Sequence, residues 1–159
     1  KDDNAKSVKE ADDTTSKLGN AAEPWKVLGK PWHFLRRGFP ANKPILWEAE
    51  ALEVLCTTLE QIEPQGKFAW DSREFVNFAS PIQEVPWAVI FTKLPEQLRL
   101  VLSGPIEGMD PDEFSRLGLA TSLDTTHPEY DMIVVDLMTV EQVADEKFYR
   151  LLLDHFTIL

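Results

Sequence analysis

Four short segments with alternating apolar side chains follow one another between residues 67 and 104: KFAWD, EFVNFAS, WAVIFTK and QLRLVLSG. In the last segment, Leu98, Leu100 and Leu102 share one face of a strand. Only a few polar or proline-containing residues separate the first segment from the second and the third from the fourth. Because parallel neighbours need a long crossover, this spacing predicts antiparallel hairpins.

Segments whose apolar residues have helical spacing lie before and after these strands. Between residues 47 and 62, Leu52, Leu55, Leu59 and Ile62 recur at intervals of three and four, which indicates a helix with one buried stripe. Residues 132–138 (MIVVDLM) predict a fifth strand, and residues 140–155 predict a final helix with a capping box at its start. Residues 110–118 suit a short helix, and residues 121–131 read as a loop.

The order of these elements is typical of an α+β fold. We expect an antiparallel sheet of about five strands with the two main helices on one face, spanning residues 47–159. Residues 1–23 are polar and predict a disordered linker, with a weak amphipathic helix as the alternative. Residues 24–46, with four prolines, predict an extended arm lying across the domain. Because the chain begins with Lys1, we expect it to be part of a longer protein.

The charges are distributed unevenly along the chain, whose formal net charge is −11. Residues 24–47 carry five bases and no acid, whereas residues 48–159 carry 21 acids and 7 bases. In one interpretation, the arm is held by the acidic body and its tryptophans fill grooves. In the other, the arm faces outward and binds a nucleic-acid backbone or a protein. The candidate binding residues are then Lys30, Trp32, His33, Arg36 and Arg37.

Motifs for enzymatic chemistry are missing from the sequence. Neither a phosphate-binding G-x-x-x-x-G-K-[ST] loop nor a G-x-G-x-x-G turn occurs. One cysteine and three scattered histidines do not make a usual zinc site. Asp124, His127, Glu129 and Asp131 form one cluster that could hold a metal, but a solvated loop explains them better. We therefore predict no metal and no cofactor.

Nucleophilic catalysis also lacks a set of partners. Cys56 lies on the apolar stripe of the first main helix, which favours a buried structural thiol. His155 falls in the last helix, and His33 has no recognisable acid or nucleophile beside it. We therefore expect a domain without enzymatic activity. The single cysteine and the absence of a long apolar run favour a cytoplasmic protein that does not enter a membrane.

The segments PWHFLRRGFP, KPILWEAEALEVLCTTLEQIEPQGKFAWDSREFVNFASP and EVPWAVIFTKLPEQLRLVLSGP resemble a C-terminal extension found on some bacterial proteins similar to the A subunit of excinuclease ABC. The resemblance spans about residues 24–159. It implies an accessory domain appended to a DNA-repair ATPase of nucleotide excision repair, contacting DNA, a repair protein or the upstream ATPase body of the same chain. The ATP-binding cassettes and zinc modules of that family match no residues here. The alternative is a protein-interaction module that binds no nucleic acid.

A looser resemblance is to the MmcQ/YjbR-like group, which has a frataxin-type fold. The order of helix, consecutive strands, strand and final helix is similar, and so is WAVIFTKLPEQLRLVLSG. The resemblance implies a basic face that contacts DNA. Residues 48–159 depart from this pattern because they are strongly acidic.

Overall fold

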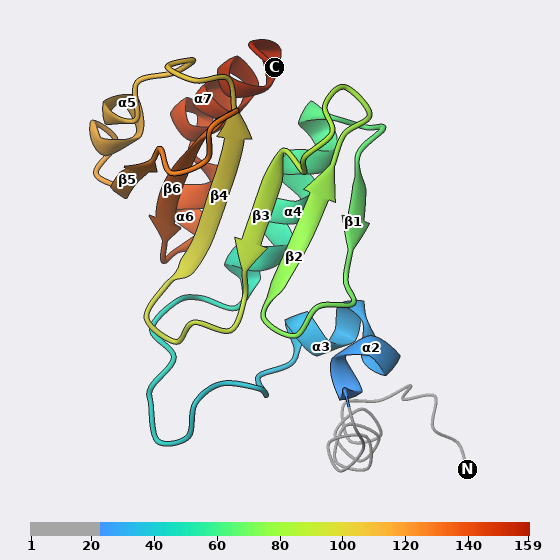
Figure 1. Cartoon of the computed structure of the whole chain (residues 1–159). Helices are drawn as coiled ribbons and strands as arrows, with labels where there is room; N and C mark the ends of the chain where they lie inside the picture. The colour runs from blue at the N-terminus through green and yellow to red at the C-terminus, as the bar shows by residue number, and fades with distance from the viewer. Residues whose placement is uncertain (1–22) are drawn as a thin grey trace.

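The computed structural model describes residues 23–159, so nearly all of the linker predicted at residues 1–23 lies outside the described residues. One six-stranded sheet organises this part of the chain (Figure 1). Its strands are β1 (Lys67–Ala69), β2 (Phe75–Ala79), β3 (Ala88–Phe91), β4 (Leu98–Gly104), β5 (Ala120–Asp124) and β6 (Asp131–Leu137). The spatial order is β1-β2-β3-β4-β6-β5, and every neighbouring pair is antiparallel. The predicted α+β class and the antiparallel hairpins are therefore confirmed.

The main helices cover one face of this sheet (Figure 1). They are α4 (Glu50–Ile62), α6 (Val140–Ala144) and α7 (Glu146–Thr157). The ladder aligns Val76 with Ile90, Ile90 with Leu100 and Leu100 with Val135, so one buried row crosses four strands. This row forms the core together with the stripe of α4 that the sequence predicted. The opposite face of the sheet is only partly covered, as antiparallel sheets permit.

The strand count of about five was wrong, because residues 120–124 form β5 rather than part of a loop. This strand lies at the edge of the sheet and pairs only with β6. None of its five residues is buried, so it has no apolar alternation that a sequence pattern could reveal. A short helix, α5 (Asp112–Ser115), precedes it at the predicted place.

The final helix differs from its prediction because it is broken in two. Thr139 caps α6 in the expected capping box with Gln142. Asp145 then leaves the helical conformation, and its side chain accepts a hydrogen bond of 2.8 Å from the backbone N–H of Lys147. A carboxylate at this position is a favourable cap, so Asp145 ends α6 and starts α7.

The expectation of an extended arm was also wrong for its first half. Residues 24–34 form two single-turn helices, α2 (Pro24–Leu28) and α3 (Lys30–Phe34). Pro24 and Pro31 stand in the first turns of these helices, where a missing N–H costs little. The prolines therefore start short helices while preventing a long one. The two helices lie beyond one end of the sheet, near β1 and β2 (Figure 1).

Candidate cationic interaction site

Two of the five predicted binding residues point into the protein. Trp32 is only 6% exposed, and its indole N–H donates a 2.8 Å hydrogen bond to the carbonyl of Arg73. Gly38 closes over this ring with a φ of +84°, and a Cβ atom there would lie 2.6 Å from Trp32 Cζ2. Only glycine suits both requirements. The indole is thus enclosed between the arm and the loop that joins β1 to β2.

His33 is buried beside Trp32, with 2% of its surface exposed. Its Nε2 lies 3.2 Å from the carbonyl of Trp70, and its Nδ1 lies 2.7 Å from Thr92 Oγ1. Because a carbonyl can only accept, the proton sits on Nε2 and Nδ1 accepts from the hydroxyl. Burial, and secondarily the charge of Lys93, lower the pKa of His33 to about 4. The neutral ring therefore joins the arm to Thr92, just after β3, and to Trp70, just after β1.

Lys93 is the residue at this end that sequence reasoning missed. Its Nζ donates hydrogen bonds to the carbonyls of Trp32 (2.7 Å) and Leu35 (3.1 Å), at the C-terminal end of α3. The same ammonium lies 5.1 Å from the ring centres of Trp32 and Phe39. Within residues 23–159, no carboxylate forms an ion pair with it. Burial, and then the charge of Arg36, lower its pKa to about 7.

The lowered pKa of Lys93 predicts that stability rises with pH above neutrality. The unfolded chain holds a proton on this lysine up to about pH 10.5, whereas the folded chain releases it near pH 7. Between pH 7 and 9, we expect the free energy of unfolding to increase by up to about 2 kcal/mol more in the wild type than in Lys93→Met. Urea unfolding at several pH values measures this difference. Parallel pH profiles for the two proteins would contradict the assignment.

Arg36 is hydrogen-bonded within the fold, yet its side chain is partly exposed. Its Nη2 donates a 2.9 Å hydrogen bond to the carbonyl of Trp47, and its guanidinium lies 4.8 Å from the centre of the Trp47 ring. Trp47 in turn donates a 2.8 Å bond to the carbonyl of Leu94. Through these contacts the arm packs on the loop between β3 and β4, to which Leu94 belongs. Desolvation lowers the pKa of Arg36 from its ordinary value.

The remaining cations lie at the surface of the same region. Lys30 is exposed, with its Nζ 5.6 Å from the Trp70 ring centre and 5.7 Å from that of Phe34. Arg37 is half-buried. Arg73 is exposed and lies 5.4 Å from the Trp25 ring centre. We use the name cationic end for the set Lys26, Lys30, Arg36, Arg37, Lys43 and Arg73, of which Lys26 forms an ion pair of 3.1 Å with Glu23.

A cavity of about 360 Å³ opens within the cationic end. Its charged lining residues are Lys43, Arg73, Lys93, Glu74 and Glu96. Lys43 lies 3.8 Å from a carboxylate oxygen of Glu96, and both side chains are well exposed. An exposed ion pair at this distance is weak, so Lys43 is available to an anion from solution.

The other chemical candidates have structural partners. His127 stacks on Tyr130 at 3.8 Å between ring centres, and its Nδ1 accepts a hydrogen bond from the backbone N–H of Glu129. Burial raises the pKa of the Cys56 thiol to about 12. Nothing in residues 23–159 groups three or more metal-ligating side chains at one place.

No family model, no curated protein and no solved structure matches the chain. Among the described residues, no helix has both the length and the apolar character needed to cross a membrane.

Proposed function

We propose that this chain is a non-catalytic accessory domain of a cytoplasmic DNA-repair ATPase similar to the A subunit of excinuclease ABC, and that its cationic end contacts DNA. Residues 24–159 resemble a C-terminal extension of such proteins, and this resemblance supports the proposed kind of parent protein. The observation that carries the DNA contact is the position of Lys30, Lys43 and Arg73. All three are exposed in a chain whose residues 48–159 are strongly acidic, and Lys43 and Arg73 line the same cavity.

The contact proposed here is with phosphates and not with bases. Trp32 and His33 are buried and hydrogen-bonded, so stacking on a base would require the arm to detach. The cations remain outside, and aromatic rings lie beneath Lys30 and Arg73. A contact of this type is independent of DNA sequence and weakens as salt rises.

The expected measurement is duplex binding followed by fluorescence anisotropy at several salt concentrations. Lys30→Gln/Lys43→Gln removes two exposed charges without removing a buried hydrogen bond. Removing one phosphate contact lowers the slope of log affinity against log salt by about 1. We therefore expect the double variant to bind more weakly. The magnitude of its slope of log affinity against log salt should be smaller by about 2.

A matched control is Lys147→Gln/Arg150→Gln, which removes two exposed cations from α7. This control protein should bind DNA as the wild type does. Absence of binding at low salt, or equal losses in the two double variants, would refute the DNA contact.

A second candidate is a protein-interaction module that binds no nucleic acid and docks on its upstream ATPase body or on another repair protein. The observation in its favour is the excess of acids, 21 against 7 bases, in residues 48–159. Such a surface repels DNA at distances shorter than about 10 Å in ordinary salt. Co-purification with the upstream region, together with no DNA binding, would select this candidate.

A further inference from the structure

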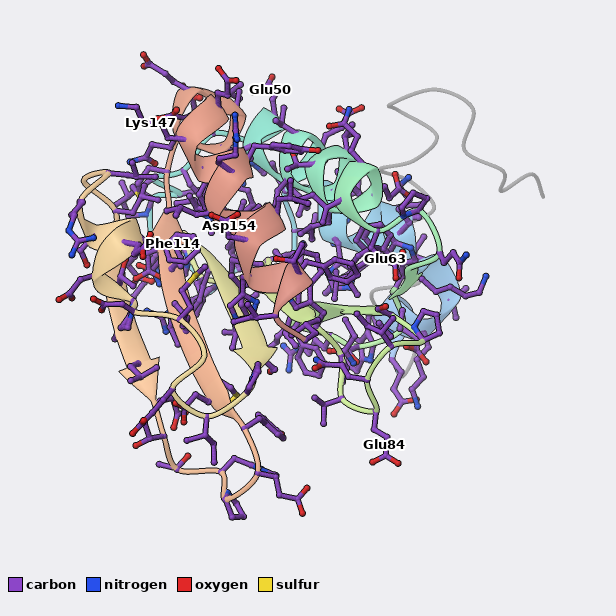
Figure 2. All side chains as sticks on the ribbon, turned by 90° about the horizontal axis from the view of Figure 1, so that it is seen from above. Glu50, Glu63, Glu84, Phe114, Lys147 and Asp154 are labelled. Atoms are coloured by element: carbon purple, nitrogen blue, oxygen red, sulfur yellow. The ribbon has the colours of Figure 1, made fainter. Side chains whose placement is uncertain are left out.

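A groove of about 610 Å³ runs along the outer layer of the fold, between α4 and the pair α6–α7. Figure 2 shows α4 and α7 side by side at this surface. Its uncharged lining residues are Val54, Thr57, Thr58 and Gln61 of α4, Val143 and Ala144 of α6, and Tyr149 of α7, of which Thr57 and Gln61 are exposed polar residues. Val143 is buried, Val54 and Tyr149 are half-buried, and Ala144 is exposed. The groove thus offers apolar and small side chains that the core does not fully cover.

Carboxylates border this groove from both helices. Glu53 of α4 and Glu146 of α7 are lining residues, both exposed. Within residues 23–159, neither forms an ion pair. Glu50, Glu60 and Glu141 add exposed acids on the same helices. Lys147 lies on the side of α7 away from α4 in Figure 2. Lys30 lines a neighbouring pocket together with Glu53 and Glu60.

We propose that this groove binds a basic amphipathic helix of a partner protein. An apolar floor between two helices accepts side chains at positions i, i+3, i+4 and i+7 of a third helix. An extended peptide would need free backbone groups to pair with, but the helices on both sides use theirs internally. The carboxylates at the border complement lysine or arginine beside the apolar stripe. They also repel nucleic acid, so the occupant is a protein segment.

This inference does not depend on DNA binding, because no residue of the cationic end lines the groove. The two surfaces adjoin where Lys30 and Glu53 line one pocket. Lys30→Gln/Lys43→Gln leaves every lining residue of the groove unchanged. The two proposals can therefore fail separately.

The test uses a synthetic helical peptide with leucine at i, i+3, i+4 and i+7 and lysine at most other positions. A scrambled peptide of the same composition, with leucines spread around the helix, has the same charge. Isothermal titration calorimetry on the full chain measures both. We expect saturable binding of the amphipathic peptide and at least about tenfold weaker binding of the scrambled one, because burying a single leucine contributes that much.

Two variants locate the binding. Glu53→Gln/Glu146→Gln should weaken the binding of the amphipathic peptide about three- to tenfold, because two exposed charge pairs are lost. Ala144→Arg places a long cation in the floor and should abolish binding. Glu84→Gln/Glu129→Gln neutralises two exposed acids elsewhere, and Figure 2 shows Glu84 on the other side of the molecule. This control should bind as the wild type does.

Thermal unfolding checks that each variant is folded. Equal affinity for the two peptides, or an equal loss in the groove and control double variants, would overturn the proposal, because binding would then follow net charge alone. Self-association of the wild type that disappears in Ala144→Arg would assign the groove to a second copy of the chain, which also overturns it.

Discussion

Replacement of Trp32 by alanine is expected to lower the free energy of unfolding by about 3–5 kcal/mol. Trp32 is a buried side chain that holds three contacts at once. Its indole N–H bonds to the Arg73 carbonyl, its ring lies beneath Lys93, and Gly38 packs against its edge. Removal leaves a large cavity and an acceptor without its donor. Urea unfolding followed by circular dichroism measures the loss.

Trp25→Ala is the matched comparison, because this tryptophan belongs to the same arm but is only half-buried. We expect it to destabilise the protein less than Trp32→Ala, by less than about 2 kcal/mol. If Trp32→Ala instead changed stability by under about 0.5 kcal/mol, as an ordinary surface substitution does, the arm would not be part of the folded domain.

Lowering the pH from 7 to 4 is expected to produce the second large loss of stability. Trp87 donates a 2.9 Å hydrogen bond from its indole N–H to His155 Nδ1. An indole nitrogen cannot accept, so Nδ1 must be unprotonated and the ring neutral. Burial lowers the pKa of His155 to about 4. The unfolded chain takes up this proton near pH 6.5, so stability is full above that value and falls until pH 4.

For His155 alone, the fall corresponds to about 3 kcal/mol. His155→Gln retains an acceptor for Trp87 but does not titrate, so its stability should decrease less over the same range. His127→Gln removes a histidine from the loop between β5 and β6 and serves as the control for the loss of a histidine. A profile for His155→Gln as steep as that of the wild type would rule out His155 as the cause. Chemical unfolding at pH 7, 6, 5 and 4 provides the comparison.

The fold could be predicted where one face of an element is buried and the other is not. Leu98, Leu100 and Leu102 alternate because β4 is central in the sheet and covered by helices on one side. The edge strand β5 escaped prediction because none of its residues is buried. The break at Asp145 also escaped, since the apolar spacing continues from α6 into α7 and only the capping carboxylate marks the change.

The segment that carries the candidate site could be located from the sequence, but the direction in which its side chains point could not. Five cations without an acid mark residues 24–47 as unusual, and composition alone shows this. Whether Trp32 and His33 face inward depends on Arg73, Thr92 and Trp70, which lie 37 to 59 residues away. Such long-range partners leave no local pattern. Lys93 was similarly hidden, because a lysine at the end of a strand is usually exposed.

Exchange of the indole N–H protons by nuclear magnetic resonance tests the central claim most directly, namely that Trp32 and His33 of the arm face inward while Lys30 and Lys43 stay exposed to a ligand. Trp32 and Trp47 donate to backbone carbonyls, and Trp87 donates to His155 in the core. We predict that all three indole protons exchange slowly, and that the Trp32 and Trp47 protons stay protected when duplex DNA is added. Rapid exchange at Trp32 and Trp47 while Trp87 remains protected would contradict the account.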